Sequence, residues 1–432
     1  MSELSYLEKL LDGVEVEWLA LREVIHSLKT GLNPRQNFQL NTTDAQGYYV
    51  TVREIQGGKI VFLDKTDRVN HTALALINGR SNLEADDILF SGTGTVGRTA
   101  IVEGNPIDWN IKEGVYTIKP IKENIIPKFL LYLLNTSEII KEYSKKIVGN
   151  PVMSLPMGDL KKLLIPIPCP NNPEKSLAIQ SEIVRILDKF TAITAELTAE
   201  LTMRKKQYNY YRDHLLSFKD AASEVEWKTL GEIGEFIRGK RFTKADYVEE
   251  GISVIHYGEI YTRYGVSATD ALSKVRTDMA KSLRYAEPGD VILTDVGETV
   301  EDVGKAVAWL GDGKVAIHDH CYAFRHTMNP KFVSYCMQTA SFIAEKAKYV
   351  ARTKVNTLLI NSFSKILIPV PYPNDPEKSL AEQTRIVNVL DNFDTLTSSI
   401  SEGLPREIEL RQKQYEYYRD LLFSFPKPET VA

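Results

Sequence analysis

The sequence predicts an α+β protein in which two globular mixed α/β domains are separated by two long antiparallel coiled-coil helices, arranged as a pseudo-twofold internal repeat. Three observations predict this architecture. Long blocks of the chain recur about half a chain later, a proline-rich joint opens the longest repeated block, and apolar residues then recur at helical spacing. The stretches between the repeated blocks mix short β-rich runs, glycine turns and shorter helical patterns.

The internal repeat consists of three matched blocks. Residues 165–190 (IPIPCPNNPEKSLAIQSEIVRILDKF) match residues 368–393 (IPVPYPNDPEKSLAEQTRIVNVLDNF) at 17 of 26 positions, 203 residues apart. Residues 206–218 (KQYNYYRDHLLSF) match residues 413–425 (KQYEYYRDLLFSF) at 10 of 13 positions, now 207 residues apart. A shorter match, VEWLALREV against VEWKTLGEI, opens each unit. A repeat of this length determines the architecture before any motif does.

The repeat divides the chain into five segments. The matched blocks form helical regions, and the two long stretches between them differ far more from each other. Residues 6–18 also echo residues 211–227, so the chain begins with the tail of a helical unit and its ends can meet in a closed layout. The predicted segments are an N-terminal helical segment 1–19, a first domain 20–164, a central helical region 165–228, a second domain 229–367 and a distal helical region 368–432.

Composition places the chain among water-soluble globular proteins. Apolar residues make up 43% and charged residues 25% of its 432 residues, no run of 18 apolar residues predicts a membrane helix, and the acidic first residues lack a secretory signal. Cys169, Cys321 and Cys336 are scattered and odd in number, which predicts a reducing cytoplasm and no disulfide or zinc framework. The net charge of −4 argues mildly against nucleic acid, although local patches decide binding.

The longest repeated block predicts a long helix that begins after the proline-rich joint, because proline cannot donate and favours extended backbone before it. Asn172 and Asp375 suit the capping position, and the proline that follows each suits the first helical position. A helix over residues 174–218 is about 65 Å long and needs a partner, which the second copy supplies in antiparallel orientation. The coiled-coil stripe is Ile183, Leu187, Phe190, Leu197 and Leu201 in the first copy and Ile386, Leu390, Phe393 and Ile400 in the second.

The two helical regions differ in length. Between the matched blocks the first has 15 residues and the second 19. The extra four coincide with Gly403-Leu404-Pro405, which predicts a kink or interruption of the second helix. The first helix instead carries a tandem TAEL over residues 194–201. The helices are at the least a structural coiled coil, and their defined length also favours a spacer.

Both globular stretches predict mixed α and β structure. Each contains an aspartate-led strand followed by a glycine turn, which begins at Asp87 in the first domain and at Asp290 in the second. Further strands are expected at Tyr48–Val52, Lys59–Leu63 and Val115–Ile118, and one amphipathic helix is expected at Pro127–Tyr143 and another at Pro330–Ala347.

The turn of the first domain matches a dinucleotide fingerprint, because residues 92–97 read GTGTVG. A strand pattern follows it where the fingerprint requires a helix, so a plain hairpin turn is the first interpretation. The second is a turn that presents Thr93, Thr95 and Arg98 to a phosphate or a base.

Two further motifs lack the context that their chemistry requires. Gly234-x4-Gly239-Lys240 resembles a phosphate loop, but Arg241 stands where Ser or Thr binds magnesium. His318 and His320 lie on one face of a predicted strand without a second ligand pair, so no metal site is expected. No methyltransferase tetrad, HExxH or GxSxG motif is found, and no catalytic residue is predicted.

Basic, aromatic and amide residues cluster in segments predicted as loops and favour DNA binding. Such side chains contact phosphates, and Arg, Asn and Gln read base edges in the major groove. An ordinary solvated surface role is the alternative for each. The candidates are Lys29, Arg35, Gln36, Tyr48, Arg53, Thr93, Thr95, Arg98, Lys145, Lys146 and Asn150 in the first domain and Arg238, Lys240, Arg241, His256, Tyr257, Arg263, Tyr264, Lys348, Arg352, Lys354 and Asn356 in the second.

The duplicated IPIPxPxNPEKSLAIQ and KQYxYYRDxLLSF blocks, together with the tandem TAEL, resemble the specificity (S) subunit of type I restriction–modification enzymes. The resemblance is closest to the subfamily with TAEL repeats in its central helix. It covers the whole chain and is most specific at residues 165–218 and 368–425. DILFSGTGTVGRTA also resembles a stretch common in target-recognition domains of this family, whereas DVGETVEDVGKAV in the second domain departs from it.

The resemblance implies that each globular domain is a target-recognition domain that reads one half of a bipartite, asymmetric site in double-stranded DNA. The helices would hold the gap between the half-sites and dock two methylation (M) subunits. The M subunits would supply S-adenosylmethionine chemistry on adenine, and restriction (R) subunits would add translocation and cleavage that need ATP and magnesium. The S subunit itself would catalyse nothing, hold no cofactor and have no membrane partner.

Two other functions fit part of the pattern. A coiled-coil adaptor that joins protein partners without DNA explains the repeat but not the divergence of the domains. A self-sufficient methyltransferase predicts S-adenosylmethionine binding by the chain alone. The base sequence of the target cannot be derived from the residues, because base contacts depend on loop geometry, water and DNA shape.

Overall fold

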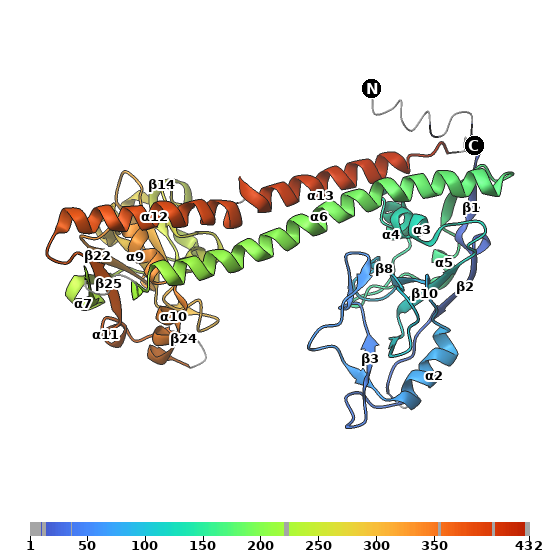
Figure 1. Ribbon diagram of the computed structural model, residues 1–432, viewed down its shortest axis with the longest axis horizontal. Helices are drawn as coiled ribbons and strands as arrows, with labels where there is room; N and C mark the ends of the chain where they lie inside the picture. Colours follow the sequence, from blue (N-terminus) through green and yellow to red (C-terminus); the bar gives the residue numbers. More distant parts are fainter. Residues whose placement is uncertain are drawn as a thin grey trace. The chain divides into compact units, whose positions relative to one another are not determined.

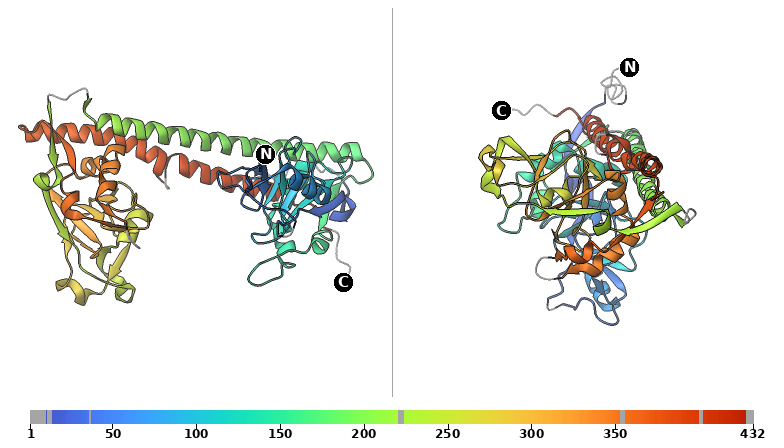
Figure 2. Two further views of the ribbon diagram at one scale, coloured as in Figure 1. Left: turned by 90° about the horizontal axis from the view of Figure 1, so that it is seen from below. Right: turned by 90° about the vertical axis from the view of Figure 1, so that its left-hand side faces the viewer.

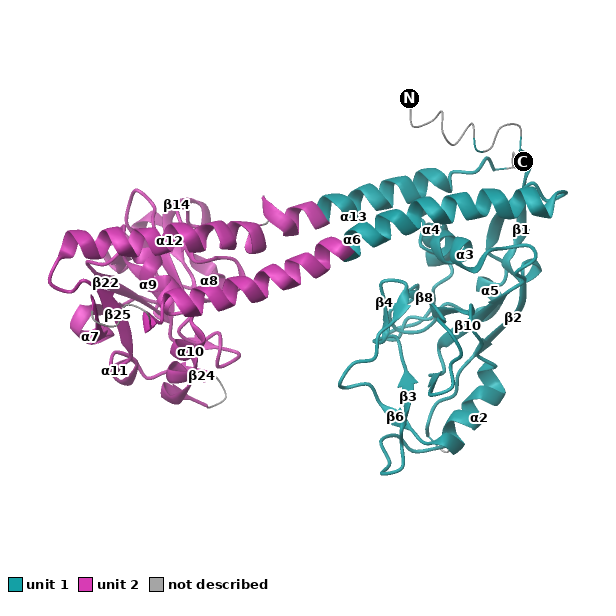
Figure 3. Cartoon of the chain, in the orientation of Figure 1, with its two compact units in different colours: residues 1–195, 409–432 teal, residues 196–408 magenta. Residues whose placement is uncertain are grey.

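The computed structural model describes residues 10, 14–35, 37–219, 224–352, 356–399 and 402–427. The chain forms two compact units, unit 1 with residues 1–195 and 409–432 and unit 2 with residues 196–408 (Figure 3). Each unit combines one globular domain with segments of the long helices. Three residues that the sequence singled out lie outside the described part of the chain, and they are Gln36, Lys354 and Ile400.

Three long helices account for the repeated blocks: α6 (Pro173–Leu215, 43 residues), α12 (Pro376–Ser398) and α13 (Gly403–Leu422). The predicted caps are confirmed, since the Lys175 and Lys378 amides donate to Oδ1 of Asn172 and Asp375, both at 3.0 Å. The predicted interruption of the second helix is also confirmed. Gly403 opens α13 with φ +74°, and a Cβ there would lie 2.4 Å from the Thr395 carbonyl oxygen.

Within each unit the two helix segments lie side by side and run antiparallel (Figures 1 and 2). In unit 1 the Phe190 ring of α6 stacks on Tyr418 of α13, with ring centroids 5.3 Å apart. In unit 2 the equivalent Phe393 of α12 stacks on Tyr211 of α6, at 5.5 Å. Of the predicted stripe, Ile183, Leu187, Ile386 and Leu390 are buried in the cores that the helices share with the globular domains, and Leu197 and Leu201 are half-buried.

The domain of unit 1 is built on a four-stranded antiparallel sheet in the order β2-β10-β7-β8. Side chains of strand β7, inside this sheet, alternate between two cores. Phe90 packs with the α3 and α6 side chains, and Leu89 packs with the β3 and β9 side chains. The strands are β1 (Val16–Ala20), β2 (Ile25–Thr30), β3 (Gly47–Val50), β4 (Ile55–Gln56), β5 (Lys59–Ile60), β6 (Arg68–Val69), β7 (Ile88–Ser91), β8 (Thr99–Ile101), β9 (Trp109–Ile111), β10 (Val115–Pro120) and β11 (Leu164–Pro168), and the helices are α2 (His71–Ser81), α3 (Pro127–Leu134), α4 (Ser137–Ser144) and α5 (Met157–Leu160).

The domain of unit 2 is built on a five-stranded sheet in the order β13-β22-β18-β20-β15. Leu293 of the central strand packs toward α9 and the long helices, and Ile292 packs into a core on the opposite face. The strands are β12 (Val225–Thr229), β13 (Gly234–Arg238), β14 (Tyr247–Ile255), β15 (Ser267–Ala268), β16 (Ser273–Val275), β17 (Tyr285–Ala286), β18 (Val291–Thr294), β19 (Val296–Gly297), β20 (Ala306–Trp309), β21 (Val315–Ile317), β22 (Cys321–His326), β23 (Val350–Ala351), β24 (Asn356–Leu358) and β25 (Leu367–Pro371), and the helices are α7 (Leu230–Ile233), α8 (Tyr257–Thr262), α9 (Pro330–Cys336), α10 (Ala340–Lys346) and α11 (Ile360–Phe363).

The two helices expected at Pro127–Tyr143 and Pro330–Ala347 are each wrong as single helices. The first is α3 followed by α4, and the second is α9 followed by α10. In both, a threonine side chain accepts the backbone N–H of the residue three positions later and caps a new helix: Thr136 accepts from Ile139, and Thr339 from Phe342. The amphipathic pattern continues through the break, which is why periodicity alone does not reveal it.

Candidate nucleic-acid interface

Each domain is fixed to its helix pair by a carboxylate of the first matched block. In unit 1, Asp188 of α6 accepts from the Lys128 ammonium at 2.7 Å and from the Tyr132 hydroxyl at 2.5 Å. Burial raises the pKa of the Tyr132 phenol, so it stays a donor. Unit 2 repeats the arrangement at 2.6 and 2.7 Å with Asp391, Lys331 and Tyr335.

Two further contacts repeat between the units. Buried Gln180 of α6 accepts the Ile126 N–H at 2.8 Å, and buried Gln383 of α12 accepts the Asn329 N–H at the same distance. The ends of the second matched block contribute equally, because a carboxylate there accepts an N–H from the first turn of α4 or α10. These pairs are Asp420 with Ser137 at 3.2 Å and Asp213 with Ala340 at 3.3 Å. We call the set of these contacts the helix mount of each domain, and the helix mounts of the two domains are equivalent.

The glycine turn of unit 1 is a β-hairpin. β7 pairs with β8 antiparallel, and the Ser91 hydroxyl ties the turn together by donating to the Thr95 carbonyl at 2.6 Å and accepting the Arg98 N–H at 2.7 Å. Gly97 has φ +96°, and a Cβ there would lie 2.2 Å from the hydroxyl oxygen of Tyr143 in α4. The hairpin interpretation is confirmed, and the turn presents the exposed side chain of Thr95 to solvent.

A second loop, residues 148–154, lies against this hairpin. The Gly94 N–H donates to the Met153 carbonyl and the Leu155 N–H to the Gly92 carbonyl, both at 2.8 Å. The Thr93 and Ser154 hydroxyl oxygens lie 3.4 Å apart. The structure thus brings together the predicted residues of the hairpin with those that follow α4, which are Lys145, Lys146 and Asn150.

Unit 2 has the same framework with different side chains. The strand after its hairpin begins beyond Gly304, which has φ +69° and whose N–H donates to the Thr294 carbonyl, as the Gly97 N–H does to Ser91. A Cβ on Gly304 would lie 2.9 Å from the side chain of Lys346. Lys346 is buried and donates to the Glu301 carbonyl at 3.0 Å, and burial lowers its pKa to about 8. A buried lysine therefore supports the acidic turn where unit 1 has a tyrosine.

The other unit 1 candidates lie at the edge of the hairpin. The Arg98 guanidinium donates to the Val52 carbonyl at 3.1 Å, which ties the hairpin to the turn that holds Arg53. Arg53 is half-exposed and pairs with Asp67 at 3.2 Å. Both arginines therefore act first as internal ties. Lys29 pairs with Thr117 on the edge strand β2, and Arg35 lies in a turn with φ +35°.

Sequence reasoning missed an aromatic cluster around Tyr48. The Phe62 ring stacks on the Tyr48 ring at a centroid distance of 4.3 Å, and the Arg68 guanidinium lies 4.3 Å from the Tyr48 centroid. The strand expected at Lys59–Leu63 is wrong beyond Ile60, because β5 ends there and the next three side chains, Val61, Phe62 and Leu63, are about two-fifths exposed. The apolar run VFL between charged residues is the feature of the sequence that could indicate this cluster, but its pattern predicts a strand instead.

The unit 2 candidates fall into two groups. Arg238 is the last residue of the edge strand β13, donates to the Asp319 carbonyl at 2.9 Å and lies 3.4 Å from Asp295, with exposed Lys240 and Arg241 after it. Gly234–Arg238 is strand β13, so the sequence that resembles a phosphate loop does not form one. The second group lies by the hairpin: Lys348 pairs with Glu345, Asn356 donates to the Glu298 carbonyl, and Arg352 is exposed. Arg263 is exposed, and Tyr264 accepts the Leu272 N–H.

The expected strand through His318 and His320 is wrong, since both residues lie in the turn between β21 and β22. His318 donates from Nε2 to the Phe242 carbonyl and accepts the His320 N–H at Nδ1, and burial lowers its pKa to about 4. Burial also lowers the pKa of His256, whose ring centroid lies 4.6 Å from that of His318. His320 Nδ1 lies 3.0 Å from Asp295 Oδ1, and Tyr257 packs against all three rings. Among the described residues no His, Cys, Asp and Glu group suits a metal ion.

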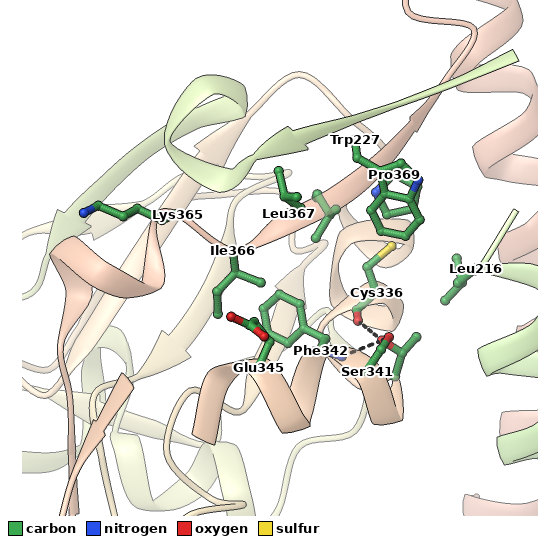
Figure 4. A pocket seen from close by; sticks show the side chains of 12 residues that line it. Leu216, Trp227, Cys336, Ser341, Phe342, Glu345, Lys365, Ile366, Leu367 and Pro369 are labelled. Carbon is green, nitrogen blue, oxygen red and sulfur yellow. Dashed lines mark hydrogen bonds between the residues drawn. The ribbon is translucent and has the colours of Figure 1, made fainter. Parts of the chain in front are cut away.

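A pocket in unit 2 lies near the domain's helix mount (Figure 4). Its lining is mainly apolar and includes Trp227, Phe342 and Leu367. Burial raises the pKa of the Cys336 thiol, and the Lys348 hydrogen bond lowers the pKa of Glu345. The thiol is thus held protonated, and the pocket supplies no activated nucleophile.

Comparisons with known proteins agree with this geometry. A family profile described as "Type I restriction modification DNA specificity domain" matches residues 14–203 and again 222–410. The EcoR124I/EcoR124II specificity subunit of Escherichia coli is 40% identical over the full length of both chains, and the EcoprrI specificity subunit of the same organism is 33% identical over 93% of each.

The fold also matches a solved structure described as the structural basis of complex assembly and conformational transition of the type I R-M system. The TM-score is 0.61 at 17% identity, and the match covers 94% of this chain and 97% of that chain. In the part of the chain that the structure describes, no helix is long and apolar enough to cross a membrane.

Proposed function

Because the chain belongs to the family of type I restriction–modification DNA specificity subunits, we propose that each unit reads one half of a bipartite, asymmetric site in double-stranded DNA. Residues 20–164 and 229–367 are the two target-recognition domains in this proposal. One observation carries it: the domains sit on equivalent mounts, yet their hairpins differ in charge and shape. Equivalent mounts suit equivalent partners and DNA backbones, and unlike hairpins suit unlike base sequences.

The DNA-contacting surface is proposed to centre on the hairpin and its neighbouring loop in each unit. In unit 1 this surface holds Thr93, Thr95, Lys145, Lys146 and Asn150. In unit 2 it holds Lys348, Arg352 and Asn356, with Arg238, Lys240 and Arg241 beside the histidine turn. Contact with DNA stays a prediction for all of these residues and for the other candidates.

The long helices are proposed to set the gap between the half-sites and to dock two M subunits. Exposed apolar side chains recur at equivalent positions of the two copies, which supports two equivalent partners. Tyr210 of α6 is 63% exposed and its counterpart Tyr417 of α13 is 55% exposed. Leu164 and Leu367, at the edges of the two mounts, are 52% and 50% exposed.

Catalysis is proposed to reside in partner subunits that act with this chain in the cytoplasm. The M subunits would bind S-adenosylmethionine and methylate adenine, and R subunits would use ATP and magnesium for translocation and cleavage. The relatives are named specificity subunits, which supports a non-catalytic role for this chain and gives no support to a DNA-free adaptor.

Retention on DNA tests the proposal. The purified chain with its M partner is expected to hold one bipartite duplex at least about 10³-fold more tightly than a scrambled duplex of the same length. Equal binding to both would contradict DNA recognition and favour the adaptor. Calorimetry of the chain alone with S-adenosylmethionine is expected to show no binding, and a measured affinity would favour a self-sufficient methyltransferase.

A further inference from the structure

The loop beside the unit 1 hairpin carries an uncharged apolar tip, residues Val148–Met153 (VGNPVM). Val148 is 55% exposed, Val152 58% and Met153 45%. Exposing three large apolar side chains on one short loop is unfavourable in water, so their grouping calls for an apolar target.

The apolar tip is held firmly in place. Val148 and Ser154 exchange both backbone hydrogen bonds, at 2.8 and 2.7 Å, which closes the loop at its base. The Met153 carbonyl accepts the Gly94 N–H, which fixes the tip to the hairpin. Its side chains are therefore presented at a set position beside Thr93, without a large ordering cost on binding.

The surroundings of the apolar tip favour DNA over a protein partner. The first turn of α4 contacts the long helices through Ser137 and Asp420, and eight residues of helix carry the chain about 12 Å along before the tip begins. The tip thus lies at the end of α4 away from the helix mount. Lys145, which pairs with Glu142 at 2.8 Å, and exposed Lys146 precede it; Lys146 borders the apolar group with positive charge, as a target with flanking phosphates requires.

The corresponding loop of unit 2 has a basic sequence in place of an apolar one, and its end is held at matching backbone positions. The Leu358 N–H donates to the Asp295 carbonyl, as the Leu155 N–H does to Gly92, and β19 pairs with β24 where Thr93 bridges Ser154. Between these fixed points the unit 2 sequence reads ARTKVN, in which Arg352 is exposed and residues 353–355 lie outside the described part of the chain.

In the major groove the only apolar group that a base edge offers is the thymine 5-methyl. We propose that Val148, Val152 and Met153 contact thymine methyl groups in the half-site read by unit 1. This inference rests on the proposed function and adds the kind of base contact that unit 1 makes.

Deoxyuridine scanning tests the inference with the full chain bound to its M partner. Each thymine of the bipartite site is replaced in turn by deoxyuridine, which removes only the methyl group. The wild-type complex is expected to bind about fourfold more weakly at one or more positions of one half-site, the effect of one buried methyl-sized group. The variant Val148→Asn, Val152→Asn, Met153→Gln replaces all three apolar side chains by amides of similar size, without a methyl group for thymine, and is expected to bind both duplexes equally. Arg352→Ala is the matched control and is expected to keep the full deoxyuridine effect.

Three results would overturn the inference. They are a deoxyuridine effect that persists in the Val148→Asn, Val152→Asn, Met153→Gln variant, the absence of any effect in the wild type, and an effect confined to the half-site that an exchange of residues 20–164 leaves unchanged. Loss of M-subunit binding by that variant with DNA contacts unchanged would also overturn it, in favour of a protein-docking tip. If the wild-type complex still prefers its bipartite duplex when one of these results is obtained, the proposed function stands. Loss of that preference contradicts the proposed function itself.

Discussion

Replacing Gly97 by alanine is expected to disable one half-site and leave the other intact. The residue has φ +96°, where an L side chain costs about 1–2 kcal/mol. The new Cβ would also lie 2.2 Å from the Tyr143 hydroxyl oxygen and 3.0 Å from the ring carbon that bears it. Tyr143 is buried with its ring edge against Phe90, so relief requires the core to open, and overpacking of this kind costs about 1–3 kcal/mol.

Gly94 in the same hairpin is the matched control. It has φ +82°, but a Cβ there would have no atom within 4 Å, so Gly94→Ala carries only the backbone cost. Thermal unfolding and hydrogen exchange of the hairpin amides measure the difference, and duplexes altered in one half-site measure its effect on recognition. Gly97→Ala is expected to be less stable than Gly94→Ala by about 1–3 kcal/mol. Adding Tyr143→Phe to Gly97→Ala is expected to restore part of the loss. Equal stability of the two alanine variants would refute the argument from packing.

Three further predictions follow from the helices and from unit 2. Inserting a third TAEL after residue 201 lengthens α6 by about 6 Å. Methylation mapping is expected to show a gap between the half-sites that is wider by about one or two base pairs, with both half-sites unchanged. An unchanged gap would contradict the proposal that the helices set the spacing. Tyr335→Phe removes a buried hydrogen-bond donor to Asp391 and is expected to lower the free energy of unfolding of unit 2, measured by hydrogen exchange, by about 1.5–3 kcal/mol. Tyr132→Phe is expected to have the same effect on unit 1 only. An equal loss in both units from either variant would contradict the independence of the two helix mounts. Burial lowers the pKa of His326 to about 4, below its value in the unfolded chain, so the free energy of unfolding of unit 2 is expected to fall by about 3 kcal/mol as the pH drops from 6.5 toward 4. The His326→Asn variant is expected to lack this part of the acid sensitivity, and identical pH profiles of variant and wild type would count against the argument.

The sequence was sufficient for the features that depend on local pattern. The caps at Asn172 and Asp375, the interruption at Gly403 and the hairpin over residues 92–97 all follow from residues close together in the chain. It failed where a single side chain decided a boundary, as Thr136 does between α3 and α4.

Pairings between distant residues could not be predicted from one sequence. The sequence offers Arg98 as one candidate for DNA contact, and it does not reveal that the Arg98 guanidinium donates to the Val52 carbonyl, 46 residues away. The Val148–Met153 tip has no signature of its own, because VGNPVM becomes informative only when Met153 is seen against Gly94 and its side chains are seen to be exposed.

Methylation mapping of a domain exchange tests the central claim most directly. Residues 20–164 are replaced by the corresponding domain of a relative, and the chain is expressed beside its M subunit. Modified adenines are expected to appear in a site with one new half, one unchanged half and the original gap. Modified adenines with both halves altered, or with the original site retained, would contradict the claim that each unit reads its own half of the DNA target.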